Sequence, residues 1–385
     1  MRTRVTMNAL CRVGARYGRA TVLALSAGLL LASCAPMPPQ KTGEPRAVVF
    51  PPPPEEARFV YERSIYSSGD VVPDESGAQF RRMLTGELRS GEGLAKPYAV
   101  AVYQGRIFLS DSVERFIKVF DVPNGRYYKI GVDDPGQLTK PLGIDIDRQG
   151  TLYVADASLK TIMLYDKDGK FLRKVGGTKW FDRLTSVTVD PKGERIYAVD
   201  IGGVQSEKHQ VRVFDARTGE HLFDIGKRGR ETGEFNLPRD VAIGRNGELY
   251  VVDGGNFRVQ SFDRDGKFLR TFGTVGRNLG SFARPKEVAT DREGNVYVVD
   301  TAFGNFQIFT PQGELLLFVG DRSEQDGPAK YMLPSGIYVD EDGRVYMVDQ
   351  WFRKVDVYRP VQVKPSEGFL GKRPNSDVKK SAAAK

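Results

Sequence analysis

Six aspartates recur along this 385-residue chain, each at the end of a short apolar run such as RIFLSD, TLYVAD or ELYVVD. The six residues are Asp111, Asp156, Asp200, Asp253, Asp300 and Asp349. A carboxylate can ligate a metal, transfer a proton, or accept hydrogen bonds from the amides of a tight loop. A catalytic group is needed once, whereas a loop brace is needed in every copy of a repeat. The recurrence therefore predicts a structural role for these aspartates.

Metal chemistry has little support among the other acidic and histidine residues. The stretches DKDG (166–169), DRDG (263–266) and DEDG (340–343) resemble the start of a calcium loop, but no glutamate follows at the spacing that an EF-hand requires. Asp-Gly pairs of this kind favour hairpin turns. The two histidines, His209 and His221, are too few for a three-ligand catalytic zinc site, and we expect both at the surface. We expect no bound metal and no cofactor.

The elements that carry the aspartates form an internal repeat, with intervals of 45, 44, 53, 47 and 49 residues between successive aspartates. Fourteen to sixteen residues before the aspartates stand Pro97, Pro141, Leu184, Pro238, Pro285 and Pro334. Three residues before these stand Leu94, Leu138, Phe181, Phe235, Phe282 and Tyr331. Each unit reads as four short strands rich in Val, Ile, Tyr and Phe, separated by Gly, Asp and Asn. Six four-stranded units of this length predict an all-β, six-bladed β-propeller.

The two ends of the repeat array complement each other. The sixth unit stops after KVDVY (354–358) without a fourth strand, and the strand-like ARFVYERSI (57–65) has no unit of its own. We expect 57–65 to complete the last blade and close the ring, which removes an exposed sheet edge.

The repeat resembles the NHL repeat. The shared pattern is P-x-G-(I/V)-x-(V/I)-D, then G-x-(L/I)-Y-V-x-D, (R/K)-(I/V)-x-x-(F/Y)-D and G-x-(F/L)-L-x-x-(V/F)-G, over residues 94–360. The third unit departs from it, with Leu184 in place of proline and five extra residues after Asp200. The resemblance implies a six-bladed propeller, a fold that specifies no single activity. Relatives of this type include zinc-dependent amidating lyases, and six-bladed lactonases share the fold.

The N-terminal segment is predicted to target and anchor the protein. Residues 1–33 hold five arginines and no acid, and an apolar run of 14 residues covers 20–33, which suits a signal peptide. The run ends in LASC, which resembles the lipobox of bacterial lipoproteins and implies lipidation of Cys34. A proline-rich linker then covers 34–56, the propeller 57–360, and a disordered basic tail 361–385. Alanine after Cys34 implies the outer membrane, facing the periplasm.

The net charge of +8 is confined to the ends of the chain. The leader contributes +5 and the tail +4 (six basic and two acidic residues), so residues 34–360 carry 8 − 5 − 4 = −1. A propeller of nearly neutral charge is not expected to bind nucleic acid.

Three carboxylates are placed in the channel of the predicted propeller. The second residue after each proline position should face the channel and is usually small, but here two neighbouring blades have Asp240 and Glu287, and Asp145 lies two positions deeper in another blade. These three side chains either converge on a cation or polar ligand, or line a wet channel paired with Arg239 and Lys286. We favour the second interpretation.

Aromatic and basic residues are predicted on the face that carries the aspartate loops. This combination is typical of protein interfaces. The candidate residues for binding a partner are Tyr98, Arg239, Phe257, Arg258, Lys286, Phe303, Trp351, Phe352 and Arg353, with Arg115, Lys160 and Lys354 nearby.

Together these features predict a monomeric, lipid-anchored propeller of the cell envelope that binds a protein, peptide or glycan and is not an enzyme. The alternative is a metal-dependent lactonase or lyase that uses the channel carboxylates.

Overall fold

The computed structural model describes residues 47–74, 83–86, 91–203 and 205–371. The predicted signal peptide, Cys34, linker residues 34–46 and tail residues 372–385 lie outside these ranges. Within them, no helix has the length and apolar character needed to cross a membrane.

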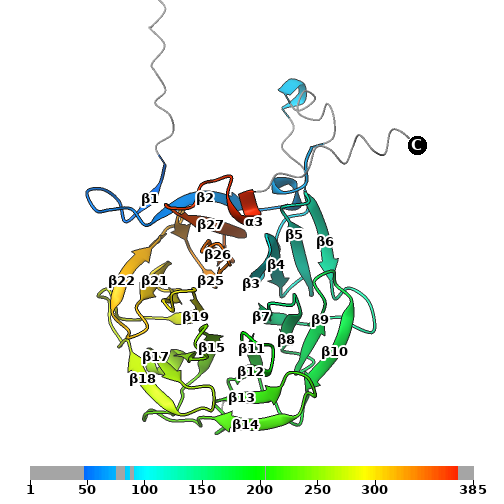
Figure 1. Ribbon diagram of the computed structural model, residues 1–385, viewed down its shortest axis with the longest axis vertical. Coiled ribbons are helices and arrows are strands. Elements are labelled where there is room, and N and C mark those ends of the chain that lie inside the picture. Colours follow the sequence, from blue (N-terminus) through cyan, green and yellow to red (C-terminus); the bar gives the residue numbers. More distant parts are fainter. Residues whose placement is uncertain (1–46, 75–82, 87–90, 204, 372–385) are drawn as a thin grey trace, which may run out of the picture. The chain divides into compact units, whose positions relative to one another are not determined.

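Six antiparallel sheets stand in a ring around a central axis, as predicted (Figure 1). Blade 1 consists of β3 (Pro97–Tyr103), β4 (Arg106–Asp111), β5 (Phe116–Asp121) and β6 (Arg126–Ile130). Blade 2 consists of β7 (Pro141–Ile146), β8 (Leu152–Asp156), β9 (Thr161–Tyr165) and β10 (Phe171–Gly176). Blade 3 consists of β11 (Leu184–Val189), β12 (Arg195–Asp200), β13 (Gln210–Asp215) and β14 (His221–Ile225). Blades 4 and 5 consist of β15 (Pro238–Ile243), β16 (Leu249–Asp253), β17 (Arg258–Phe262), β18 (Phe268–Phe272); and β19 (Pro285–Thr290), β20 (Val296–Asp300), β21 (Asn305–Phe309), β22 (Leu315–Val319).

Blade 6 combines the two ends of the array, which confirms the predicted closure. Its strands are β25 (Pro334–Val339), β26 (Val345–Asp349) and β27 (Lys354–Pro360), followed by β2 (Phe59–Ile65) and the short β1 (Val49–Phe50). β2 pairs antiparallel with β27, for example Tyr61 opposite Tyr358 and Ile65 opposite Val355. The described end of the predicted linker therefore contributes a fifth strand, β1.

The described part of the predicted tail also packs on the propeller. The short helix α3 (Gly368–Gly371) places Leu370 in the apolar cluster between blades 6 and 1, where it is 3% exposed. The Phe369 amide donates a hydrogen bond of 2.7 Å to Asp342. The remaining small elements are η1 (Ser68–Asp70), η2 (Gly254–Asn256) and the parallel pair β23 (Asp321–Arg322) with β24 (Lys330–Tyr331).

The core is a ring of six apolar clusters, one at each interface between neighbouring blades. The inner strands read as nearly continuous apolar runs, because both of their faces pack against neighbouring blades. The cluster between blades 6 and 1 includes Ile65 of β2, so the closing strand is part of the core.

A glycine with positive φ ends the fourth strand of blades 1 to 5 and makes room for the next blade. These glycines are Gly131, Gly176, Gly226, Gly273 and Gly320. A Cβ on Gly273 would lie 2.2 Å from the ring of Phe282, and the other four glycines face the equivalent side chain at similarly short range. The buried residue three positions before each proline therefore fills the space that the glycine leaves.

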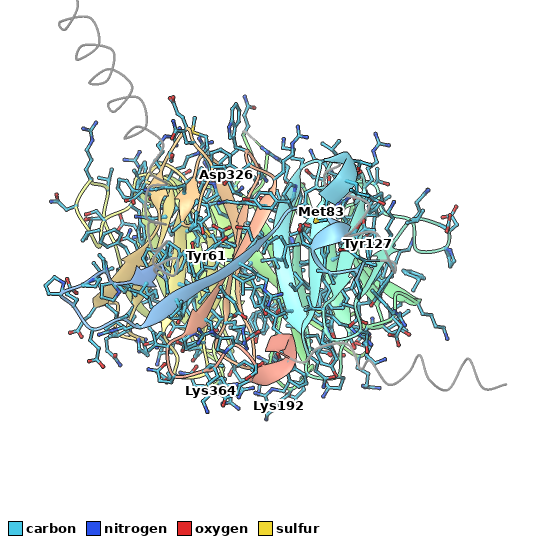
Figure 2. The ribbon with its side chains drawn as sticks, turned by 90° about the horizontal axis from the view of Figure 1, so that it is seen from above. Tyr61, Met83, Tyr127, Lys192, Asp326 and Lys364 are labelled. Atoms are coloured by element: carbon cyan, nitrogen blue, oxygen red, sulfur yellow. The ribbon has the colours of Figure 1, made fainter. Side chains whose placement is uncertain are left out.

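The ring has two distinct faces. The top face carries the loops between blades and the aspartate loops between second and third strands, and the bottom face carries the turns between first and second strands. Figure 2 shows Asp326 toward the top face and Lys192 and Lys364 at the bottom face.

Candidate functional site

The recurring aspartates are fully buried hydrogen-bond acceptors on the top side of the blades. Asp300 accepts the amides of Ala302 (2.9 Å) and Phe303 (3.2 Å) in its own loop. Its other oxygen accepts the amides of Ala283 (2.7 Å) and Arg284 (2.9 Å), which precede the first strand of the same blade. Asp111, Asp156 and Asp349 repeat this arrangement, and Asp200 is close to it. Each carboxylate therefore joins two loops of one blade.

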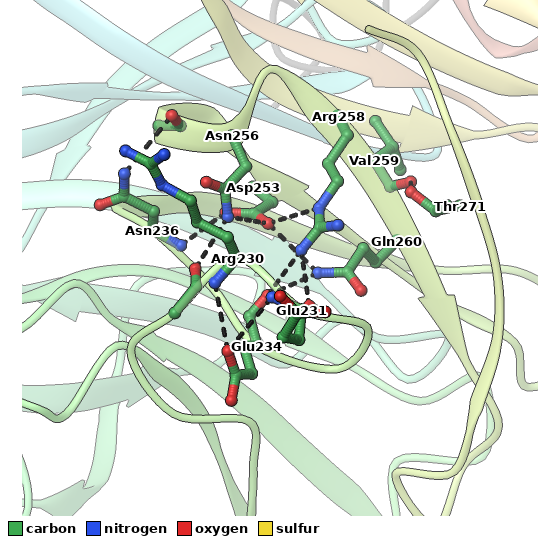
Figure 3. Close-up of polar contacts among 12 residues, drawn as sticks. Arg230, Glu231, Glu234, Asn236, Asp253, Asn256, Arg258, Val259, Gln260 and Thr271 are labelled. Carbon is green, nitrogen blue, oxygen red and sulfur yellow. Dashed lines mark hydrogen bonds and ion pairs between the residues drawn. The ribbon is translucent and has the colours of Figure 1, made fainter.

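Asp253 departs from the repeat and corrects the prediction for Arg258 (Figure 3). Its carboxylate accepts Arg258 Nε at 2.8 Å and the side-chain amide of Asn256 at 2.8 Å. Arg258 Nη2 also donates to the backbone carbonyls of Glu231 (2.8 Å) and Glu234 (3.0 Å). Arg258 thus holds the loop that precedes blade 4 through its Nε and Nη2 donors.

Two more of the candidate residues have structural contacts. Phe257 adopts a left-handed backbone with φ of 56° and packs on the cluster between blades 4 and 5. Lys354 is fully buried, with ion pairs to Asp326 (2.9 Å) and Asp356 (3.1 Å), and this contradicts its placement on the top surface.

Sequence analysis missed a buried polar position at the third residue of the third strand. Lys118 donates to the carbonyl of Gly93 at 2.6 Å and pairs with Glu92 at 3.1 Å. Gln307 accepts the amide of Gly280 at 2.8 Å and donates to the carbonyl of Ser281 at 3.0 Å. Arg212 and Gln260 occupy the same position. A polar residue recurring inside an apolar strand was the available signal, and it marks a tie to the loop between blades.

The centre of the top face is basic. Lys286 of blade 5 reaches the ring of Tyr98 of blade 1, with Nζ 4.7 Å from the ring centroid. Burial lowers the pKa of Lys286, the charge of Glu287 raises it, and the positive charges of Arg239, Arg284 and Lys96 lower it, which together bring the pKa to about 8. Cations from blades 1, 4 and 5 therefore lie within electrostatic reach of one another.

The remaining candidate residues differ in exposure. Trp351 is 61% exposed. Arg239, Arg353 and Arg115 are also exposed, whereas Phe303, Phe352 and Lys160 are half-buried. We therefore define the top arc as the exposed or partly exposed side chains Tyr98, Arg239, Lys286, Phe303, Trp351, Phe352 and Arg353.

A cavity of about 240 Å³ occupies the channel and is lined by the first strands of all six blades. Asp145, Asp240 and Glu287 all line it. Pairing between first and second strands is interrupted just after each proline, between Pro238 and Val241 in blade 4, so Asp240 lies in a bulge.

The channel is narrow at its top end. A Cβ on Gly143 would lie 2.6 Å from Ser186 Cα, and one on Gly336 would lie 2.9 Å from Ala99 Cα. The glycines expected at these positions are therefore required by the close approach of neighbouring first strands. At the other end the lining includes the exposed Arg148 and Arg245 in the bottom turns, so the cavity opens on the bottom face.

The channel carboxylates bind the neighbouring blades, not the cations that we expected. Asp145 accepts the hydroxyl of Thr188 (2.7 Å) and the amide of Val189 (3.0 Å). Asp240 accepts the amide of Val288 at 2.8 Å and the hydroxyl of Ser186. These donors belong to first strands, whose inner edge has no strand to pair with. Among the described residues, no ion pair joins Asp145, Asp240 or Glu287 to a cation.

Burial dominates the ionisation of these carboxylates. It raises the pKa of Asp145 and of Asp240 to about 6, partly offset by their hydrogen bonds. It raises the pKa of Glu287 well above its ordinary value, and the charge of Asp240 raises it further.

Both histidines have specific contacts, which corrects their placement at the surface. His209 is 2% exposed, and its Nδ1 accepts the amide of Leu237 at 3.2 Å. His221 stacks on Trp180, with ring centroids 4.1 Å apart, and pairs with Asp224 at 2.8 Å. Within the part of the chain that the structure describes, no group of three His, Cys, Asp or Glu residues is arranged to hold a metal ion.

Comparison with known proteins identifies the repeat. The NHL repeat model matches residues 235–262, which belong to blade 4. One blade of this six-bladed propeller therefore matches the NHL repeat. Proteins similar to part of this chain include the probable peptidyl-alpha-hydroxyglycine alpha-amidating lyase pgal-1 of Caenorhabditis elegans, 30% identical over 111 residues, which cover 28% of this chain and 30% of the relative. The B-box type zinc finger protein ncl-1 of the same organism is 28% identical over 131 residues, covering 34% of this chain and 15% of the relative. The matches thus span less than a third of either relative.

Solved structures share the fold of the NHL propeller. A structural genomics protein of unknown function from Bacteroides thetaiotaomicron has a TM-score of 0.58 at 16% identity, covering 80% of this chain and 76% of that protein. A gluconolactonase from Xanthomonas campestris has a TM-score of 0.54 at 15% identity, covering 78% and 98%. At these identities the likeness concerns the fold alone.

Proposed function

We propose that this NHL propeller is a binding module of the cell envelope, held at a membrane by a lipid on Cys34, which engages an acidic protein, peptide or glycan through the top arc. The basic centre of the top face carries this proposal. The membrane anchor rests on the lipobox-like sequence before Cys34.

The positions on either side of the six proline positions are biased toward positive charge. Of these twelve residues six are basic and none is acidic: Lys96, Lys140, Arg183, Arg239, Arg284 and Lys286. They immediately precede or begin the innermost strands, so they surround the top end of the channel. A concentration of one charge on one face attracts ligands of the opposite charge and sets their orientation.

Aromatic side chains accompany these cations. Trp351 is largely exposed although tryptophan is among the residues that gain most from burial, and Tyr98 lies under Lys286. Exposed tryptophan and arginine are the residues that most often dominate the binding energy of an interface. The top arc therefore combines a source of affinity with a preference for acidic partners.

The enzymatic alternative, a metal-dependent lactonase or lyase, draws on the lyase and gluconolactonase relatives. It would use Asp145, Asp240 and Glu287 as metal ligands. Asp145 and Asp240 already accept hydrogen bonds from backbone amides and hydroxyls, so a metal would have to displace those donors. The geometry favours the binding module.

The test is capture of a partner from membranes by the full-length protein, followed by measurement of the affinity for the partner identified. Trp351→Ala with Arg239→Ala should weaken binding at least about thirtyfold, the equivalent of about 2 kcal/mol. The affinity of the unaltered protein should also fall as salt is added.

The control removes two exposed cations from the bottom face, Lys192→Ala with Arg217→Ala, and should leave the affinity unchanged. If the control loses the partner and the top-arc variant retains it, the binding face has been assigned to the wrong side. Equal melting temperatures for all three proteins would show that the differences do not come from unfolding.

A further inference from the structure

Two buried carboxylates, Asp240 and Glu287, and the half-buried Asp145 share the channel cavity, and none of the three forms an ion pair with a cation among the described residues. Asp240 is 8% and Glu287 7% exposed, and with Asp145 they line one cavity. The adjacent cation, Lys286, lies within electrostatic reach of Glu287, but its ammonium group sits over the ring of Tyr98. Buried carboxylates are normally paired with a cation or neutralised by a proton, because an isolated buried charge costs several kcal/mol.

Glu287 has an unused hydrogen-bond acceptor. The Ile337 amide hydrogen-bonds to its carboxylate, but the buried Oε1 has no hydrogen-bond partner. Glu341 lines the same cavity toward its open end, and its buried Oε2 also has no partner. Both side chains line a cavity that opens at the bottom face, past the exposed Arg148 and Arg245.

The other acidic residues of the cavity are committed to turns. Asp147, Asp291 and Asp340 each accept two backbone amides and a tyrosine hydroxyl, and Asp190 accepts the Glu194 amide. They close the turns between first and second strands. Glu287 and Glu341 are therefore the carboxylates that have an oxygen left to bind a ligand, whereas Asp145 and Asp240 already accept hydrogen bonds from neighbouring blades.

We propose that the channel is a binding site for a small organic cation, a primary ammonium or a guanidinium about the size of a lysine or arginine side chain. The ammonium group of the ligand would donate a hydrogen bond to Glu287 Oε1. It would also lie near Asp240 and Asp145, whose carboxylates would add to the electrostatic attraction of the cation. Tyr338 also lines the cavity, and an aromatic ring attracts a cation that lies over its face.

Size and charge both limit the ligand. The cavity of about 240 Å³ is narrow at its top end, where the first strands of neighbouring blades approach closely, so it suits a small ligand. A primary ammonium has three donors and no acceptor, which suits a site of several carboxylate oxygens. The site is separate from the top arc, so it can exist whether or not the top arc binds a partner.

The test is isothermal titration of the full-length protein with putrescine, a four-carbon diamine, and with 1,4-butanediol as its neutral analogue of equal length. Putrescine should bind with a stoichiometry near one, and the diol should not bind. Glu287→Gln keeps the shape but removes the charge, and should weaken putrescine binding at least about tenfold, because hydrogen bonds between charged groups are roughly twice as strong as neutral ones.

The matched control is Asp321→Asn, a neutralised carboxylate on the top side whose side chain is 68% exposed; it should bind putrescine as the unaltered protein does. If Glu287→Gln fails to fold, Glu341→Gln replaces it, with an expected loss of at least about threefold. The proposal is overturned if putrescine shows no saturable binding up to roughly 10 mM, well above a millimolar Kd. It is also overturned if the diol binds equally well, or if the folded channel variants bind like the unaltered protein.

Discussion

Closure of the ring depends on a buried ion pair, and we expect Glu62→Gln to weaken it. Glu62 lies on β2, the N-terminal closing strand, and is 7% exposed at its side chain. Its Oε2 accepts Nε of Arg344, a fully buried arginine, at 2.9 Å. The other guanidinium nitrogens face Asp342 at 3.5 Å and the Glu367 carbonyl at 3.0 Å. The pair thus joins the N-terminal strand and the C-terminal segment to blade 6.

The expected loss is at the lower end of the range for a broken buried pair. Removing one partner of a buried ion pair typically costs about 3–5 kcal/mol, because the other charge stays buried without compensation. Asp342 remains near Arg344 in the variant, so we expect about 3 kcal/mol. For a large domain each kcal/mol lowers Tm by roughly 2–4 °C, so a loss of about 3 kcal/mol gives about 6–12 °C.

The assay is thermal unfolding at a fixed scan rate, with Asp321→Asn as the control. Asp321 pairs with Lys330 at 3.2 Å, but both side chains are exposed, 68% and 43%, so its loss should cost less than about 1 kcal/mol. The double variant Glu62→Gln with Arg344→Met should be less destabilised than the sum of the single variants, because neither charge is then left alone. If Glu62→Gln has the same melting temperature as Asp321→Asn, the β2–β27 pairing alone closes the ring, and the reasoning is refuted.

Three further predictions concern the channel, the inter-blade glycines and the anchor. Asp240→Asn keeps an acceptor for the Val288 amide and a contact with Ser186. Because folding raises the pKa of Asp240 from 3.8 to about 6, the protonated carboxyl contributes its full stability below pH 3.8, and this stability is lost as the pH rises through 6. In denaturant titrations the variant should therefore be more stable than the unaltered protein by up to about 3 kcal/mol at pH 8, and equally stable at pH 4. Gly273→Ala should lower the stability by about 3 kcal/mol, because its φ of 82° strains an alanine backbone and the added Cβ clashes with Phe282. Gly280→Ala is the control: its φ is 84° but no atom lies within 4 Å, so only the backbone strain of about 1–2 kcal/mol should remain. Equal melting temperatures for the two variants would contradict this prediction. Cys34→Ser should move the protein from the membrane fraction or leave it unprocessed, and a fully processed, membrane-bound variant would exclude the lipid anchor.

The fold was predictable because its determinants recur in the sequence. Each blade repeats the proline position, the buried residue three positions earlier and the aspartate, so an error in one copy is corrected by the others. The closing strand at 57–65 was predictable for the same reason, since a missing strand is visible only against a complete pattern. The short β1 and α3 belong to no repeat, and their sequences, which are rich in proline or polar residues, gave no periodic signal.

The candidate site was predicted less well, because its residues are the exceptions to the repeat. Strand alternation correctly placed Asp145, Asp240 and Glu287 in the channel, where all three line the cavity. Their hydrogen-bond donors lie 43 to 54 residues away in neighbouring blades, a distance that no local pattern encodes. Arg258 illustrates the same limit, since the carbonyls that surround it come from a loop 24 to 27 residues earlier. The sequence alone does not distinguish an arginine that faces solvent from one that donates hydrogen bonds to the carbonyls of a distant loop.

The two proposed sites meet at one pair of consecutive residues. Lys286 belongs to the basic centre of the top face, and Glu287 belongs to the channel below it, so the charge of each acts on the other. An organic cation bound at Glu287 would add positive charge beneath Lys286 and strengthen the attraction of the top face for an acidic partner. Because coupling between two binding equilibria is reciprocal, the acidic partner would raise the affinity of the channel for the cation by the same factor. Neutralising Glu287 removes this link but also acts on the charge of Lys286, so the top arc is best tested with variants away from this pair, such as Trp351→Ala with Arg239→Ala.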